Sequence, residues 1–216
     1  MSDDLTCHGH KVPLERLTNP RPATELENGP EKGLYQNKPG DLGDLASYSI
    51  VEDEPEYVSL IREHPRGERK PRPEFTHDLN AWKYVASTPG AQPEWMLWAA
   101  TTCALQRSFE GLEVAATTFD PNVLPKPGDR SIQLLVHEGA CASGQSAEGR
   151  IRVPVLEVTP DAVRVAIATV RREGGQDCQG NPNTSFTLEL PEPLGERRLI
   201  DVGVYPEREI NERKGS

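Results

Sequence analysis

The feature that most constrains the fold is an alternation of apolar and polar residues between positions 131 and 190. The apolar positions are Ile132, Leu134 and Val136, then Ile151, Val153 and Val155, then Val163, Val165 and Ile167, and finally Phe186, Leu188 and Leu190. A period of two places these side chains on one face of an extended strand. Four such segments close together predict an antiparallel β-structure with one buried face and one solvated face.

The proline and glycine content supports a β fold and argues against a helical one. The 216 residues include 20 prolines and 18 glycines, and both residue types interrupt or end helices. Short strands separated by many turns suit this composition. We therefore expect a mainly β protein, an antiparallel β-sandwich-like single domain that spans residues 45–206, with a disordered tail at 207–216.

Residues 1–44 have a different composition from the rest of the chain. Proline and glycine are frequent there, large apolar residues are few, and no hydrophobic period is sustained. A segment that buries little apolar surface cannot offset the entropy lost on ordering. We expect a flexible N-terminal arm with at most a short helix around residues 23–28.

The segment from residue 94 to residue 109 allows two interpretations. As a strand, it would direct alternate side chains to opposite faces, with Met96, Trp98 and Ala100 on one face and Trp95, Leu97 and Ala99 on the other. A helix is the alternative, because Trp95, Trp98, Ala99 and Thr102 also fit helical spacing. Upstream, residues 47–64 predict two strands around an acidic turn, and residues 80–88 predict another strand.

Net charge and motif content exclude several classes of function. The formal net charge of −10 and the pI near 5.1 argue against general nucleic-acid binding, which needs clustered Lys and Arg. The sequence contains no apolar run long enough for a membrane span and no signal-peptide pattern at its start, which leaves a cytoplasmic protein or an exported one whose leader has been removed. Nucleotide-binding, serine-hydrolase and zinc-protease motifs are missing, so we predict no catalytic residue and no cofactor.

Cys141 and Cys178 each lie in a loop of small residues beside a predicted strand end. If the strands at 151–158 and 162–170 pair as a hairpin, both loops emerge at the same edge of the sheet. A disulfide there would close a loop of about 38 residues and contribute about 4 kcal/mol, and it would persist only outside the reducing cytosol. Two unpaired structural thiols are the first alternative. The second is a catalytic or metal-binding Cys141, with His137 as a candidate base.

Cys7, His8 and His10 lie within four residues of one another and are chemically capable zinc ligands. A structural zinc site normally needs a second matched pair of ligands, and no C-x-x-C or H-x-x-x-H motif supplies one. The three residues are therefore a weak metal candidate. An unpaired Cys7, or Cys7 paired with Cys103, are the alternatives.

Four motifs occur in order in the C-terminal half: E-x-x-C-A-S-G, G-R-I-x-x-P, C-Q-G-N-P and L-x-x-P-L-G-x-R-x-L. Their positions are Glu138, Cys141, Ala142, Ser143, Gly144, Gly149, Arg150, Ile151, Pro154, Cys178, Gly180, Asn181, Pro182, Leu190, Pro193, Leu194, Gly195, Arg197 and Leu199. Residues 132–206 thereby resemble a group of uncharacterised β-rich proteins, mostly actinobacterial and often exported or lipid-anchored. The resemblance implies an extracytoplasmic location, which supports the disulfide, but it implies no activity.

Arg150 and Arg197, near Glu138 and Asp201 in this pattern, are weak binding candidates. They would either form buried ion pairs that lock the loops or bind a carboxylate ligand. The function that we favour is a non-catalytic binding module for another protein or a glycan, in the envelope or outside the cell. One alternative is a structural or assembly protein of a larger particle, such as a virion or a secretion structure; another is a hydrolase with its site near Cys141.

Overall fold

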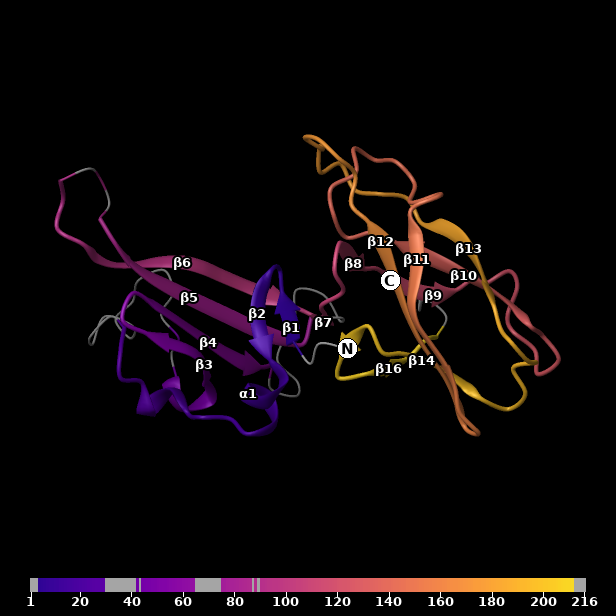
Figure 1. Cartoon of the computed structure of the whole chain (residues 1–216), viewed down its shortest axis with the longest axis horizontal. Helices are drawn as coiled ribbons and strands as arrows, with labels where there is room; N and C mark the ends of the chain where they lie inside the picture. Colours follow the sequence, from indigo (N-terminus) through magenta and orange to yellow (C-terminus); the bar gives the residue numbers. More distant parts are fainter. Residues whose placement is uncertain are drawn as a thin grey trace. The chain divides into compact units, whose positions relative to one another are not determined.

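The computed structural model describes residues 4–29, 42, 44–64, 75–86, 88 and 90–211. The fold is mainly β and contains several antiparallel sheets, as the sequence predicts (Figure 1). The described residues form two compact units, and the chain passes from one to the other between Leu105 and Gln106. The domain expected over residues 45–206 therefore includes parts of both units.

The N-terminal unit is built on a four-stranded antiparallel sheet in the order β3–β4–β5–β6. Its strands are β3 (Ser49–Glu54), β4 (Tyr57–Glu63), β5 (His77–Val85) and β6 (Glu94–Cys103), and a short 3-10 helix, η3 (Leu45–Ser47), precedes them. The two strands around the acidic turn at 47–64 are confirmed. The 94–109 segment begins with a long strand, β6, rather than a helix.

The ladder between β5 and β6 is interrupted by one unpaired residue, Trp98, which forms a β-bulge. Before the bulge Leu97 pairs with Trp82, and after it Ala100 pairs with Asn80. Because Asn80 and Trp82 share one face of β5, their partners share that face too. The predicted position of Ala100 on the face of Trp98 is therefore wrong: the bulge shifts the alternation by one residue and moves Ala100 to the face of Leu97.

An apolar cluster covers this face of the sheet. Trp82 belongs to β5, one of the two middle strands, and is 5% exposed. Side chains from two further segments, one near residue 23 and one near residue 45, pack in the same cluster. The buried members are Ala23, Leu42, Tyr48, Ile50, Val58, Leu60 and Trp82, with Leu26, Leu45, Trp95 and Leu97 partly buried around them. The segment near residue 23 is thus part of the core of this unit.

Residues 4–29 are folded, which differs from the flexible arm expected for residues 1–44. Strands β1 (Asp4–Cys7) and β2 (His10–Pro13) form a hairpin, followed by α1 (Leu14–Thr18) and η1 (Ala23–Glu25), the last within the short helix expected at 23–28. Leu5, Cys7 and Val12 are at most 2% exposed, so this short hairpin does bury apolar surface. Most of the remaining residues of the expected arm lie outside the described residues.

Asp53 of β3 ties the segment after η1 to the sheet. Its carboxylate accepts hydrogen bonds from the backbone N–H groups of Glu27 and Asn28 and from the side chains of Asn28 and Arg21. Burial raises the pKa of the Asp53 carboxyl, but these hydrogen bonds outweigh it and leave that pKa below its usual value of 3.8. A charged Asp53 therefore stabilises this part of the fold.

The C-terminal unit packs two sheets face to face. One is β13–β10–β9, and the other is β11–β12–β14–β16 with β8 beside β12 (Figure 1). The strands are β8 (Leu112–Val114), β9 (Ala116–Phe119), β10 (Ser131–His137), β11 (Ile151–Val158), β12 (Ala162–Val170), β13 (Thr184–Glu189), β14 (Arg198–Asp201) and β16 (Arg208–Glu209). All four strands expected from the alternation between 131 and 190 are confirmed.

The predicted antiparallel pairing of β11 with β12 is also confirmed, whereas β14 joins β12 in parallel. The core between the sheets consists of alternating residues from both. Its buried members are Ala115, Ile132, Leu134, Val136, Val163, Val165, Ile167, Leu188, Leu190, Leu194, Leu199 and Ile210. Because Ile210 is 3% exposed and follows β16, residues 207–211 differ from the disordered tail expected there, and residues 212–216 lie outside the described residues.

Two short strands, β7 (Leu105–Arg107) and β15 (Val204–Tyr205), complete the strands of the described residues. The backbone N–H of Arg107 donates to the carbonyl of Gly203 at 2.8 Å, and its guanidinium Nε donates to the carbonyl of Val202 at 2.9 Å. Arg107 thereby holds the start of the C-terminal unit against the segment between β14 and β15.

Candidate functional site

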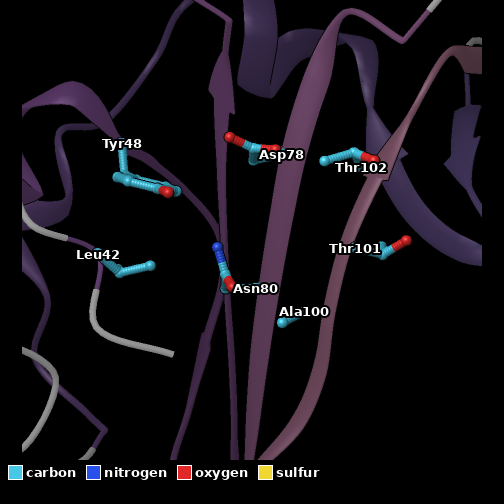
Figure 2. Close-up of a pocket in the computed structure, with 7 residues that line it drawn as sticks. All are labelled: Leu42, Tyr48, Asp78, Asn80, Ala100, Thr101 and Thr102. Atoms are coloured by element: carbon cyan, nitrogen blue, oxygen red, sulfur yellow. The ribbon is translucent and has the colours of Figure 1, made fainter. Parts of the chain in front are cut away.

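A groove with a volume of about 460 Å³ opens on the face of the N-terminal sheet that the bulge at Trp98 rearranges. Its lining residues are Leu42, Tyr48, Asp78, Asn80, Ala100, Thr101 and Thr102. Figure 2 shows Leu42 and Tyr48 on one side and β6 on the other, with Asp78 and Asn80 between them. The side chain of Thr101 points away from Asp78 and Asn80.

Asn80 has unused hydrogen-bonding capacity in this groove. The residue is 8% exposed, and its side-chain amide makes no hydrogen bond within the described residues. An amide can donate two hydrogen bonds and accept two, so this side chain can bond to a molecule that enters the groove. Buried amides are normally satisfied by protein or by water, so an unpaired one at the base of a groove is a candidate contact for a bound molecule.

Among the described lining residues Asp78 carries the only carboxylate, and the Arg62 guanidinium offsets its charge. Arg62 Nε donates to Asp78 Oδ2 at 2.8 Å, and His64 Nε2 lies 3.2 Å from Asp78 Oδ1. The Arg62 guanidinium also lies 5.3 Å from the centroid of the Tyr48 ring. The groove therefore offers the edge of an aromatic ring, an amide and a carboxylate paired with an arginine, a set suited to a small polar ligand.

Sequence reasoning did not find this groove, although one signal was present. In β5, Asp78 and Asn80 lie four and two residues before Trp82 and therefore share its face of the sheet. Polar side chains thus occupy positions where a period of two predicts core residues. Leu42 and Tyr48 reach the same groove from a segment about forty residues earlier in the chain. Local periodicity carries no information about that approach.

The structure pairs all four cysteines. Cys141 and Cys178 are cross-linked with their Cα atoms 4.5 Å apart, and Cys7 and Cys103 with theirs 5.6 Å apart. The first pair lies where the predicted β11–β12 pairing places the two loops, and the second was among the alternatives left open. Two disulfides are compatible with an oxidising compartment.

These disulfides remove two of the candidate sites. Cys141 has no free thiol to act as the nucleophile of a hydrolase, with or without His137 as its base. Cys7 has no thiolate to offer zinc, because it is cross-linked to Cys103. The two histidines have other neighbours: His8 Nε2 lies 3.0 Å from the carbonyl oxygen of Thr102, and His10 Nδ1 lies 3.3 Å from the Tyr57 hydroxyl. In the described parts of the chain, no three His, Cys, Asp or Glu side chains are grouped to hold a metal ion.

Arg150 and Glu138 form a buried ion pair that locks the Cys141 loop. Both Nη atoms of Arg150 donate to the Glu138 carboxylate at 2.5 Å, and they also donate to the carbonyls of Val170 and Ser146 at 2.8 and 3.1 Å. Glu138 is 1% exposed, and the hydrogen bond to its carboxylate raises the pKa of the Arg150 guanidinium. Of the two roles considered for Arg150, the geometry matches the locking role.

Arg197 does not meet Asp201, contrary to the interpretation of the sequence pattern. It donates instead to the carbonyls of Leu194 and Pro193 and to the Glu192 carboxylate, so it stabilises the loop that precedes β14. Asp201 accepts a hydrogen bond from the backbone N–H of Gly203 at 2.9 Å. Burial raises the pKa of the Asp201 carboxyl, although Arg208, 3.5 Å away, opposes that rise.

Comparisons with known protein families, with curated proteins and with solved structures found no match. Among the described residues, no helix has both the length and the apolar character needed to cross a membrane. The groove and the disulfides thus stand as the observations on which a function can be built.

Proposed function

We propose that this protein is a non-catalytic binding module that acts outside the reducing cytosol and holds a neutral sugar unit of a glycan in the groove of its N-terminal unit. The observation that carries this proposal is the amide of Asn80, a residue that is 8% exposed, lines the groove and makes no side-chain hydrogen bond within the described residues. A ligand that both accepts and donates hydrogen bonds would satisfy it, and each sugar hydroxyl does both.

The other lining groups support a neutral ligand. Because Arg62 already offsets the charge of Asp78, the carboxylate is available as a hydrogen-bond acceptor for hydroxyl groups without selecting a cation. Tyr48 lies beside Asp78 and Asn80, and its ring, 5% exposed, forms part of the apolar wall of the groove (Figure 2). A volume of about 460 Å³ also lies within the usual range of small-molecule sites.

The location and the absence of catalysis have separate support. Structural disulfides persist in oxidising compartments and are rare in the cytosol. Both Cys141 and Cys7 are cross-linked, so the two cysteine-based sites considered from the sequence have lost their reactive groups. An extracytoplasmic glycan-binding role is consistent with both observations.

Saturation-transfer difference NMR tests this proposal on the full-length oxidised protein. The ligands are the methyl glycosides of glucose, galactose, mannose and N-acetylglucosamine at millimolar concentration. At least one should show enhanced ring-proton signals with the wild type and not with Asn80→Leu, which keeps the branched shape of the side chain but removes the amide. Asn122→Leu is the matched control, because it makes the same change at an exposed residue of the C-terminal unit. Absence of signal for all four glycosides, or equal signal with Asn80→Leu, would refute the proposal.

A further inference from the structure

A second surface of the N-terminal unit has features of a ligand site and is independent of the groove. The β-bulge projects Trp98 from the edge strand β6, and the residue is 58% exposed. The ammonium nitrogen of Lys83 lies 3.8 Å from the centroid of the Trp98 ring. Met96, which pairs with Lys83 across the strands, is 39% exposed. Trp98, Lys83 and Met96 are called the Trp98 surface below.

Lys83 is a cation without a carboxylate partner. Its cross-strand neighbours, Tyr57 and Met96, are uncharged, and Lys83 forms no ion pair within the described residues. The Tyr57 ring also lies 5.9 Å from the ammonium nitrogen. In a chain with 34 acidic and 24 basic residues, this cation is available to a negatively charged ligand.

We propose that the Trp98 surface binds a carboxylated sugar. The indole ring would stack against the C–H face of the sugar, and the Lys83 ammonium would pair with its carboxylate. An exposed cation–π contact is weak, about 0.5–1 kcal/mol, whereas hydrogen bonds between charged groups are stronger. A carboxylate ligand can therefore draw the ammonium away from the indole, which frees that face of the ring for stacking.

The geometry favours a sugar over an acidic peptide. Aromatic anchors of protein interfaces cluster in well-packed pockets that exclude water. Trp98 instead projects into solvent as the extra residue of a bulge, so it offers a flat ring rather than a socket for a side chain. A pyranose ring can stack on one flat aromatic face. Because of the bulge, the side chains of Trp98 and Ala100 lie on opposite faces of the sheet. Ala100 lines the groove, so the Trp98 surface lies on the other face.

NMR titration of the full-length oxidised protein with trigalacturonic acid tests the inference. The observed signal is the indole N–H of Trp98, which a Trp98→Phe variant assigns among the three tryptophans. The neutral probe is the fully methyl-esterified trisaccharide, which keeps the sugar rings and removes the charges. We expect the acid to shift the Trp98 signal and the ester to bind at least about fivefold more weakly. Trp98→Ala, followed at the backbone amide of Lys83, should abolish binding.

Charge variants separate an effect at Lys83 from a general effect of net charge. Lys83→Met should weaken binding of the acid at least about fivefold, and Lys83→Arg should retain it within about twofold. Lys126→Met, on an exposed loop of the C-terminal unit, removes the same charge and should leave binding unchanged. Asn80→Leu should also leave it unchanged, so this result does not depend on the proposed function of the groove.

Three outcomes would overturn the inference. One is a trisaccharide acid that does not shift the Trp98 signal. Another is equal binding of the acid and its ester, or of the wild type and Lys83→Met, which would show that the cation plays no part. The third is tighter binding of hexaglutamate than of trigalacturonic acid, which would assign the surface to acidic peptides.

Discussion

Replacing Arg150 by Met should strongly destabilise the C-terminal unit. The substitution leaves the Glu138 carboxylate, 1% exposed, without the guanidinium that donates to both of its oxygens. Breaking one partner of a buried ion pair typically costs about 3–5 kcal/mol, because the remaining charge is uncompensated. The lost hydrogen bonds to the carbonyls of Val170 and Ser146 act in the same direction.

Hydrogen exchange of the β12 amides during urea denaturation measures this loss where it occurs. A loss of about 3 kcal/mol corresponds to more than a hundredfold faster exchange through unfolding. Arg152→Met is the matched control, since Arg152 is exposed and, within the described residues, donates only to the backbone carbonyls of Gly149 and Ile151. It should change the unfolding free energy by less than about 0.5 kcal/mol.

The double variant Glu138→Leu/Arg150→Met distinguishes the origin of the loss. If the stranded carboxylate dominates, removing it should recover at least about half of the stability, since buried ion pairs can often be replaced by apolar side chains at little cost. If Arg150→Met is no worse than Arg152→Met, the ion pair does not hold the Cys141 loop. If the double variant is as unstable as Arg150→Met, the loss comes from the backbone carbonyls and our explanation fails.

Two further predictions concern the cysteines and one acid. Peptide mapping without reductant should find Cys7 joined to Cys103 and Cys141 joined to Cys178, and any free thiol or other pairing in the wild type would contradict this. The variant Cys141→Ser/Cys178→Ser should lose about 4 kcal/mol of unfolding free energy, the value expected for a sequence separation of 37 residues. Because burial raises the pKa of Asp201 above 3.8, its contribution to stability is complete below that pH and is lost as the pH rises through the folded-state pKa. The free energy of unfolding of Asp201→Asn, measured by urea titration from pH 3 to pH 7, should therefore fall less with rising pH than that of the wild type, and parallel curves would refute this.

The strands were predictable where the signal is local. The alternation of Ile132, Leu134 and Val136, and of the three later segments, needs only the period of an extended chain with one buried face. The pairing of Cys141 with Cys178 was foreseeable for the same reason, because it follows from two neighbouring strands joined by a short turn. These inferences involve residues close in sequence or connected by one hairpin.

The N-terminal unit was less predictable because its determinants lie far apart in sequence. Leu5, Cys7 and Val12 form too short a run to reveal a hairpin, and their burial depends partly on a cross-link to a residue 96 positions later. The groove depends on the bulge at Trp98, which is a property of the register between β5 and β6. Periodicity in one strand cannot report such a shift in its partner.

The order in which the cysteines pair has a consequence for biosynthesis. The first cysteine joins the second and the third joins the fourth, so the two cross-links neither overlap nor enclose one another. A chain that emerges from its N-terminus presents each cysteine together with its correct partner before the next pair arrives. An oxidase that joins thiols in order of appearance would make both bonds correctly, and this protein would mature without an isomerase to exchange them.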